Sequence, residues 1–457
     1  MLIHESRKSR FRQSNKSRFR QSSRRQFPQN NIILAYMKVT LVNTADAGGG
    51  APAACLRLLK ALQGQPIDVQ LLIQYKKTNE PAVTGIVKNG WQKFKAKFNF
   101  FYERLPFMFF HERDKSVRFA FSTANAGISV KDEPLIRDAD ILHLHWTNSG
   151  FLSINDLKEL VDLGKPIVWT LHDMWTFTGG CHYSGTCNHF INKCGDCYFL
   201  QDENPNDISY KGWLSKAAMY AGNKNITFVA CSSWLAGVAR QSSLLNGFNI
   251  TSIPNPIDTE VYLPKDKLDM RENWGINPFA KIILFGAANI NDRRKGINFL
   301  VEALNHLTVH CPDKGLVEVV IFGKNNHFDV NTLPFKVNQL SLITSQEELA
   351  EVYSLADVFV TPSIEDNLPN TVMEALSCGA PVAAFNVGGI PEMVDHMQNG
   401  YLAEFESAAD LAKGIFTLLY AENKAELSTN ARNKVLSTFN NQKVSAQYLK
   451  IYQSILK

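Results

Sequence analysis

The sequence predicts an α/β protein of two Rossmann-like domains whose parallel sheets face each other across a cleft. First, the chain has 457 residues, which is longer than a domain with a single hydrophobic core usually is. Second, short apolar runs alternate with longer amphipathic stretches, the pattern of parallel strands joined by helices. Third, the segment IPNPIDTEVY interrupts this alternation with Pro254 and Pro256, which predicts a hinge between domains.

Nine apolar runs are the expected strands. They are residues 38–43, 69–75, 141–145, 167–172 and 226–231 before the hinge, and residues 282–286, 317–323, 358–361 and 382–385 after it. We therefore expect an N-terminal domain over residues 37–253 and a C-terminal domain over residues 254–440. Open parallel sheets bind ligands beyond the carboxyl ends of their strands, so the loops there are expected to carry the chemistry.

The composition excludes several classes of protein. Apolar residues make up 45% and charged residues 20%, the balance of a globular chain, and no apolar window is long enough to cross a membrane. No apolar stretch follows the basic N-terminus as a secretory signal would require, so we expect a cytoplasmic protein with reduced thiols. The net charge is +5, but residues 1–36 contribute +8, and the remaining −3 gives no reason to expect a nucleic-acid partner.

The basic N-terminal segment, residues 1–36, repeats the sequence KSRFRQS at residues 8–14 and 16–22. A polar repeat of this kind buries too little apolar surface to order itself, so we expect a disordered tail. Met37 directly precedes the first strand, and we expect translation to start there. The alternative is an anchor for an anionic membrane surface.

Three consecutive glycines follow the first strand, Gly48, Gly49 and Gly50. Without a Cβ they let the backbone approach a ligand closely, and the helix that follows presents free N–H groups to an anion such as a phosphate. A tight strand-to-helix turn without a ligand is the alternative.

The segment from Thr361 to Val394 is the most informative. A strand ends near Thr361, and a helix that starts around Asn370 holds Glu374 one turn further on the same face. A carboxylate there can accept two hydrogen bonds from vicinal hydroxyls such as those of a ribose. Acidic residues near a helix start are also favourable on electrostatic grounds alone.

This segment resembles the signature of the retaining GT-B glycosyltransferases of family 4. The matching residues are Pro362, Ser363, Asp366, Glu374, Ala375, Gly379, Pro381, Gly388, Gly389 and Glu392, although the first acid is usually Glu and is Asp366 here. The resemblance implies a GT-B fold. It also implies that Asp366 lies by the donor sugar, that Glu374 binds the ribose, and that Asn370, Thr371 and Gly389 help to bind the donor.

A second match covers residues 283–304, where the family has a Gly-Arg pair followed by Lys-Gly. Lys295 and Gly296 fit, whereas Ala287 follows Gly286 in place of the arginine, and we expect Arg294 to reach in instead. Such cations can neutralise a leaving diphosphate. A solvated lysine at a helix start is the alternative for Lys295.

At the end of a first-domain strand, His172 stands where the family has a His close to the donor sugar and the acceptor. The alternative is a histidine satisfied by the local backbone.

The resemblance implies an enzyme that moves a sugar, with retention and without a catalytic metal or cofactor, from a nucleotide-sugar donor to a saccharide or lipid-linked saccharide acceptor. The N-terminal domain would bind the acceptor, the C-terminal domain the donor, and the last helix, residues 441–457, would pack back on the first domain. Synthesis of cell-surface polysaccharide or glycolipid is the expected role. A non-catalytic or epimerase-like nucleotide-sugar-binding protein is the alternative, and the donor nucleotide and sugar stay open.

Four of the eight cysteines fall between residues 181 and 197: Cys181, Cys187, Cys194 and Cys197. Thiols at this density fit a structural zinc site, and free thiols or disulfides are the alternatives.

Residues 91–121 interleave seven Lys or Arg with many aromatic residues. Such a mixture can rest on an anionic membrane surface, here the inner face of the plasma membrane, and a solvated amphipathic helix is the alternative.

Overall fold

The computed structural model of the chain describes residues 37–108, 112–113, 119–201 and 204–456. The expectations for residues 1–36, namely disorder, a start at Met37 and the alternative of a membrane anchor, lie outside the described residues.

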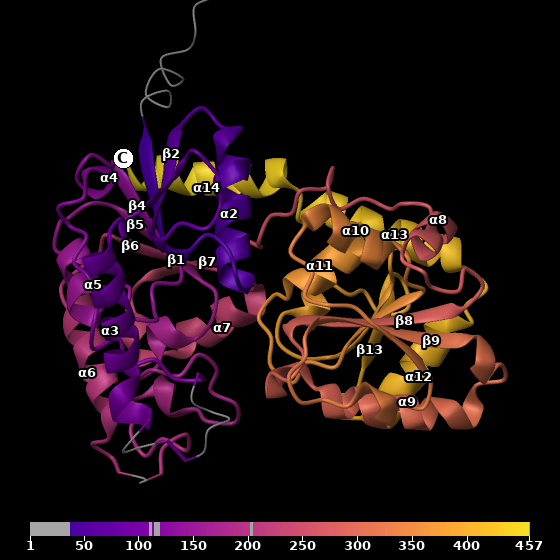
Figure 1. The fold of residues 1–457 in the computed structure, drawn as a ribbon. Helices are drawn as coiled ribbons and strands as arrows, with labels where there is room; N and C mark the ends of the chain where they lie inside the picture. Colours follow the sequence, from indigo (N-terminus) through magenta and orange to yellow (C-terminus); the bar gives the residue numbers. More distant parts are fainter. Residues whose placement is uncertain (1–36, 109–111, 114–118, 202–203, 457) are drawn as a thin grey trace, which may run out of the picture.

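The first half of the chain forms a seven-stranded sheet in the order β3-β2-β1-β4-β5-β6-β7, with every pair parallel (Figure 1). Its strands are β1 (Lys38–Ala45), β2 (Asp68–Tyr75), β3 (Val83–Gly85), β4 (Ile141–Leu144), β5 (Ile167–Leu171), β6 (Ile226–Ala230) and β7 (Asn249–Ser252). Its helices are α2 (Gly50–Gln63), α3 (Gly90–Pro106), α4 (Pro134–Arg137), α5 (Ile154–Val161), α6 (Ile208–Tyr220) and α7 (Ser233–Gln241).

The second half forms a six-stranded sheet in the order β10-β9-β8-β11-β12-β13, also parallel between each pair of neighbours. Its strands are β8 (Lys281–Asn289), β9 (Val317–Lys324), β10 (Lys336–Gln339), β11 (Val358–Thr361), β12 (Val382–Phe385) and β13 (Gly400–Ala403). Its helices are α8 (Lys267–Asn273), α9 (Ile297–His310), α10 (Gln346–Ser354), α11 (Asn370–Ser377), α12 (Ala408–Leu419) and α13 (Lys424–Thr438).

The central strands are apolar throughout because helices cover both faces of each sheet. All five residues of β5 and all five of β6 are buried, and each sheet separates two hydrophobic clusters. All nine expected strands are present, so the prediction of two α/β domains with parallel sheets is confirmed. The structure adds four strands that the sequence did not predict: β3, β7, β10 and β13.

The chain crosses between the two halves twice, and the two crossings lie side by side. Ile257, on the outward crossing, donates its backbone N–H to the carbonyl of Phe439, on the return crossing, at 2.9 Å. The return leads into α14 (Asn441–Ile455), which packs beside α2 on the first sheet (Figure 1). Its Tyr452 hydroxyl lies 2.7 Å from His143 Nδ1 under that sheet.

Candidate interdomain site

Loops from the carboxyl ends of both sheets meet at one place, which we call the interdomain site. Asn367, in the loop after β11, connects them: its side-chain amide donates to the carbonyls of Leu171 and His172 at 3.3 and 3.2 Å. Its side-chain oxygen accepts from Ser232 Oγ at 2.5 Å. The loops after β5, β6 and β11 are thus held together.

Lys295 and Asp366 form an ion pair within this site, with Nζ and Oδ2 2.5 Å apart. Lys295 follows β8 and Asp366 follows β11. Because these neighbouring strands run parallel, both side chains lie at the same carboxyl end of the sheet. Gly296 makes the approach feasible: its φ is +68°, and a Cβ there would lie 1.9 Å from the Pro362 carbonyl oxygen. Both side chains stay partly exposed, at 24% and 12%, so a ligand can reach them.

Arg294 lies beside this pair but points toward the first domain. Its guanidinium stacks over the Tyr183 ring at 5.2 Å and pairs with Asp292 at 2.6 Å. Burial raises the pKa of Tyr183, and Asp366 adds to this rise while Arg294 opposes it. Tyr183 therefore lies within reach of both charges in the interdomain site.

Glu374 is engaged by protein groups on both carboxylate oxygens. Arg57, from α2 of the first domain, reaches Oε1 at 2.5 Å, and the Tyr353 hydroxyl donates to Oε2 at 2.8 Å. The Arg57 and Glu374 side chains are only 6% and 8% exposed. Arg57 also donates to the Tyr262 hydroxyl at 3.0 Å, while its Nε and Nη1 have no hydrogen-bond partner among the described residues. A ribose at Glu374 would have to share this carboxylate with Arg57.

The glycine-rich loop after β1 faces the start of α11 across the domain boundary. Asn370 donates its side-chain amide to the Gly50 carbonyl at 3.1 Å. Gly48 has a φ of +93°, and Gly49 is the N-cap of α2. Thr371 lies in the first turn of α11, where backbone N–H groups have no intrahelical acceptor. The two helix starts thus face one another.

Gly388 and Gly389 pack so closely against the loop that holds Asp366 that no side chain fits at either position. A Cβ at Gly388 would lie 1.9 Å from the Asp366 carbonyl oxygen, and one at Gly389 would lie 1.8 Å from that of Asn367. Three residues on, Glu392 accepts the backbone N–H groups of Ser233 and Trp234 at 2.9 and 2.8 Å. A second-domain carboxylate therefore caps a first-domain helix, α7.

His172 lies at the end of β5 with both ring nitrogens facing protein groups. Nε2 is 3.0 Å from His145 Nδ1, and Nδ1 is 3.7 Å from Cys231 Sγ. Burial lowers the pKa of His172 to about 4, and Asp173 opposes this shift. The imidazole is therefore neutral near pH 7, as a hydrogen-bonding rather than a charged group.

A second histidine, His182, lies beside Asp173, and no motif in the sequence indicated a role for it in this site. His182 Nδ1 lies 2.7 Å from Asp173 Oδ2, and His182 Nε2 lies 2.9 Å from Ser122 Oγ. Asp173 also accepts from the Trp146 indole at 3.0 Å and from the Trp175 backbone at 2.8 Å. His182 and Tyr183 stand inside the cysteine-rich segment, whose only predicted role was to bind a metal. That segment also reaches the second domain, because Gly185 donates its N–H to Glu365 at 2.8 Å.

All four cysteines of that segment are free thiols, and together with His189 they line one cavity of about 20 Å³. Burial raises the pKa of Cys194 to about 11 and that of Cys197 to about 12. In the described part of the chain, no three Cys, His, Asp or Glu side chains already stand close enough to hold a metal ion.

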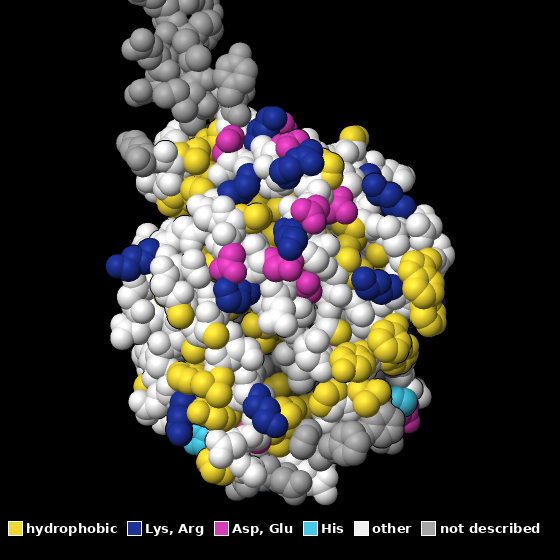
Figure 2. All heavy atoms as spheres, turned by 90° about the vertical axis from the view of Figure 1, so that its left-hand side faces the viewer, with side chains coloured by type: hydrophobic (Ala, Val, Ile, Leu, Met, Phe, Trp, Pro, Cys, Tyr) yellow, Lys and Arg dark blue, Asp and Glu magenta, His cyan; other side chains and the backbone are white. Residues whose placement is uncertain are grey.

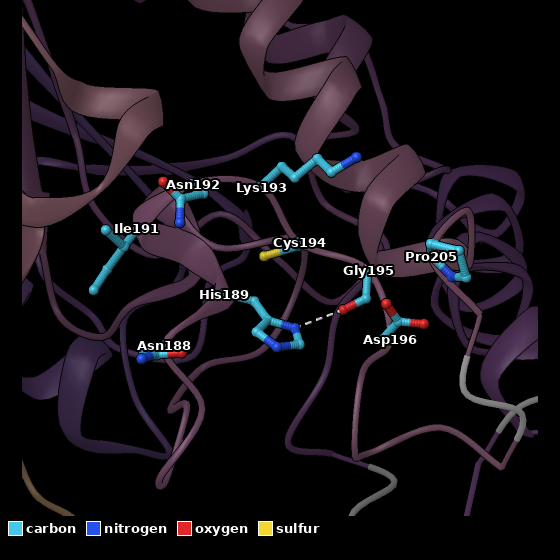
Figure 3. A pocket seen from close by; sticks show the side chains of 9 residues that line it. All are labelled: Asn188, His189, Ile191, Asn192, Lys193, Cys194, Gly195, Asp196 and Pro205. Atoms are coloured by element: carbon cyan, nitrogen blue, oxygen red, sulfur yellow. Dashed lines mark hydrogen bonds between the residues drawn. The ribbon is translucent and has the colours of Figure 1, made fainter.

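A larger hollow of about 460 Å³ opens beside the same segment, between His189 and Pro205 (Figure 3). There the His189 ring lies next to Cys194, and its Nδ1 bonds the Gly195 carbonyl at 2.8 Å. Apart from Cys194, no predicted site residue lines this hollow.

Helix α3 exposes a stripe of large apolar side chains. Trp91 is 73% exposed, and Phe94, Phe98, Phe101, Tyr102 and Leu105 continue the stripe at helical spacing. Figure 2 shows this side of the molecule, with large hydrophobic side chains gathered beside Lys and Arg on the right of the face. Residues 109–111 and 114–118, within the predicted membrane-contacting stretch, lie outside the described residues. Of the helices that the structure describes, none is long and apolar enough to cross a membrane.

Two family models match the chain. The model described as Glycosyltransferase Family 4 matches residues 48–261, and the model described as Glycosyl transferases group 1 matches residues 280–421. Together they cover every strand except β1, and they include the residues of the interdomain site.

Two curated proteins illustrate the similarity. D-inositol 3-phosphate glycosyltransferase of Pseudarthrobacter chlorophenolicus is 32% identical over 290 residues, which are 62% of this chain and 62% of that protein. N-acetyl-alpha-D-glucosaminyl L-malate synthase of Bacillus anthracis is 26% identical over 46% of this chain. The chain spans 62% and 55% of the lengths of these two relatives.

One solved structure illustrates the shared fold. Anabaena Alr3699/HepE, in complex with UDP and glucose, aligns with a TM-score of 0.57 at 16% identity, covering 92% of this chain and 100% of that one. The expected GT-B arrangement of two Rossmann-like domains is confirmed.

Proposed function

The chain belongs to the group 1 glycosyltransferases of family 4, and from this premise we propose that it transfers a sugar from a nucleotide-diphosphate sugar to a hydroxyl acceptor with retention of anomeric configuration. The observation that carries the proposal is the Lys295–Asp366 pair. Its two atoms lie 2.5 Å apart at the carboxyl end of the second sheet, where the loops contact the first domain. A cation next to a carboxylate offers one group for a phosphate and one for sugar hydroxyls.

In this proposal the donor diphosphate binds to Lys295 in place of Asp366. The ammonium group exchanges Asp366 for phosphate oxygens, and the freed carboxylate accepts hydrogen bonds from the sugar. Arg294, stacked on Tyr183, adds a second positive charge beside the leaving group. Since these side chains neutralise the diphosphate, transfer itself should need no metal ion. Glu374 receives the ribose, with Arg57 sharing its carboxylate.

Retention is supported by the way the nearby carboxylates are used. Both oxygens of Asp173 accept hydrogen bonds from protein groups, and Glu365 accepts from Gly185. We assign the sugar contact to Asp366, which lies partly exposed beside Lys295. A single carboxylate in this role differs from the pair of carboxylates that hydrolases use. We propose that the acceptor oxygen bonds to the anomeric carbon on the face that the diphosphate leaves. A diphosphate oxygen then takes the acceptor proton.

The test is nucleotide release from a panel of UDP- and GDP-sugars, with product configuration read by NMR. Lys295→Met should lower kcat/KM by a factor of about 10² or more, since it removes a charge that stabilises the leaving group. Arg293→Met, at an exposed position in the same turn, is the matched control and should leave turnover unchanged. Unchanged turnover in Lys295→Met would defeat the proposal, and an inverted product would remove retention.

We further propose that α3 docks the enzyme on an anionic membrane surface, where a lipid-linked saccharide acceptor would lie. At 100° per residue, the apolar stripe of α3 is flanked by Lys93 and Lys97 on one side and by Lys95 on the other. Aromatic side chains in the interface and cations over the headgroups are what an interfacial helix needs. This arrangement favours a role in glycolipid or cell-surface polysaccharide synthesis at the inner membrane face.

Co-sedimentation with vesicles tests the docking. The variant Trp91→Ser/Phe94→Ser/Phe98→Ser should lose most binding to phosphatidylglycerol vesicles. Phe279→Ser changes a side chain of the second domain that is 81% exposed, and it should bind like the wild type. Equal binding by both variants, or a dimer that dissociates only in the triple variant, would contradict membrane docking.

A further inference from the structure

The cysteine-rich segment contains a small cavity of the size and composition that one metal ion needs. Cys181, Cys187, Cys194 and Cys197 line a single cavity of about 20 Å³, enough for one water-sized body. Four thiols around one such space is the ligand set of a structural zinc site. The spacing C-x5-C-x6-C-x2-C keeps the ligands within one loop.

The surroundings of this cavity suit thiolates bound to a cation. The Gly179 backbone N–H donates to Cys194 Sγ at 3.0 Å, the kind of bond that stabilises a sulfur carrying negative charge. The Cys197 backbone is fixed in turn, because its N–H donates to Asp207 at 2.9 Å. The turn between these two cysteines needs left-handed backbone at Gly195 and Asp196, with φ of +140° and +49°.

A buried lysine lies against the same backbone segment as these cysteines. Lys216 is fully buried, and its Nζ donates to the carbonyls of Trp175 and Thr178, the latter at 3.0 Å. Thr178 adjoins Gly179, so the ammonium group and Cys194 lie against the same backbone segment. None of the described carboxylates lies within salt-bridge distance of Lys216. A zinc ion with four thiolates carries a net charge of −2, which would give this otherwise costly cation a partner.

We propose that Cys181, Cys187, Cys194 and Cys197 bind one zinc ion, and that this ion holds the segment 179–200 in the conformation that presents Tyr183 and Gly185 to the second domain. Binding forms four S–Zn bonds, breaks four S–H bonds and releases four protons to water. The thiols stand around the cavity rather than in contact with a common point, so they move inward as the ion enters.

The consequence for the interdomain site follows from the order of residues. Tyr183 and Gly185 lie between the first two cysteines, and they contact Arg294 and Glu365 of the second domain. A loop cross-linked through its four sulfur atoms would keep these contacts. A loop without the cross-link would gain conformations in which they are lost.

Metal analysis of the full chain, purified without a histidine tag under reducing conditions, tests the proposal. We expect about one zinc per chain in the wild type and loss of it in Cys194→Ser/Cys197→Ser. Cys311→Ser, a buried cysteine of the second domain, is the matched control and should keep its zinc. Zinc retained by the double variant, or less than about 0.2 zinc per wild-type chain, would overturn the assignment.

A second measurement uses only the wild-type protein, so its result does not depend on whether a variant folds. Wild-type protein stripped by a chelator and loaded with Co²⁺ should show the intense near-ultraviolet absorption of thiolate-to-cobalt charge transfer and the visible bands of tetrahedral cobalt. Absence of these bands would overturn the proposal. Intact-mass and thiol measurements on the same sample then tell whether the cysteines are free or form disulfides, and either result without metal counts against it.

Discussion

Arg57 of the first domain and Glu374 of the second form a buried ion pair across the domain boundary, with Nη2 and Oε1 2.5 Å apart. Removal of one partner leaves the other as an uncompensated buried charge. We expect Arg57→Met to lower the free energy of unfolding by about 3–5 kcal/mol, as measured by urea denaturation. Adding Glu374→Gln should recover part of this loss. The exposed pair Lys131–Glu159 is the control, and Lys131→Met should cost less than about 1 kcal/mol.

The buried histidines make stability depend on pH. Burial lowers the pKa of His143 to about 3, and the side chain is fully buried. Because this value lies below the ordinary value of about 6.5, the unfolded chain binds protons more readily, and stability falls as the pH drops from about 6.5 toward 3.

His143→Gln should therefore flatten the dependence of unfolding free energy on pH in that window, by up to about 1.4 kcal/mol per pH unit. Urea denaturation at pH 7, 6, 5 and 4, compared with the wild type, checks this. Parallel curves for the two proteins would show that His143 does not titrate as argued.

Glu392 caps α7 from the other domain, so its loss should loosen the boundary. Glu392→Ala removes two hydrogen bonds from helix-start N–H groups, and we expect destabilisation of about 0.5–2 kcal/mol with a larger radius of gyration in X-ray scattering. Ser153→Ala removes a cap of α5 within the first domain and is the control. It should lower stability similarly and leave the radius of gyration unchanged.

Gly389 should not tolerate a side chain, since a Cβ would lie 1.8 Å from the Asn367 carbonyl oxygen. Displacing Asn367 would break its bonds to the first domain, so Gly389→Ala should lower kcat/KM at least about tenfold and lower the melting temperature. Gly237→Ala, where a Cβ in α7 meets only open space, should keep activity and melt at the same or a higher temperature. Equal behaviour of the two variants would contradict the packing argument.

The strands predicted from the sequence are the inner strands of each sheet, and the four that were missed are the four edges. β5 and β6 are buried on both faces and are therefore continuous apolar runs. β7 reads NITS and β10 reads KVNQ, each with half-exposed or exposed residues, because an edge strand is covered less completely. Their pairing depends on tertiary neighbours, which hydrophobic periodicity does not reveal.

The residues of the interdomain site also fall into those that the sequence indicated and those that it did not. The motif residues Lys295 and Asp366 could be found because they follow two neighbouring strands of one sheet. Arg57 and Tyr183 could not, since each acts on a residue of the other domain, and nothing in an isolated α2 or in a cysteine-rich loop signals that distant partner. The sequence CHY at residues 181–183 was the available signal, but its cysteine indicated metal binding alone.

The paired crossings at Ile257 and Phe439 bear on how the two halves can move. A single connecting strand would leave one half free to rotate and translate in several directions relative to the other. Here the two connections are bonded to each other at 2.9 Å, which opposes twisting of one domain against the other. A hinge rotation about the paired connections is then the motion with the lowest free-energy cost. Opening of the interdomain site should therefore follow one reproducible arc, with displacements that grow with distance from these crossings.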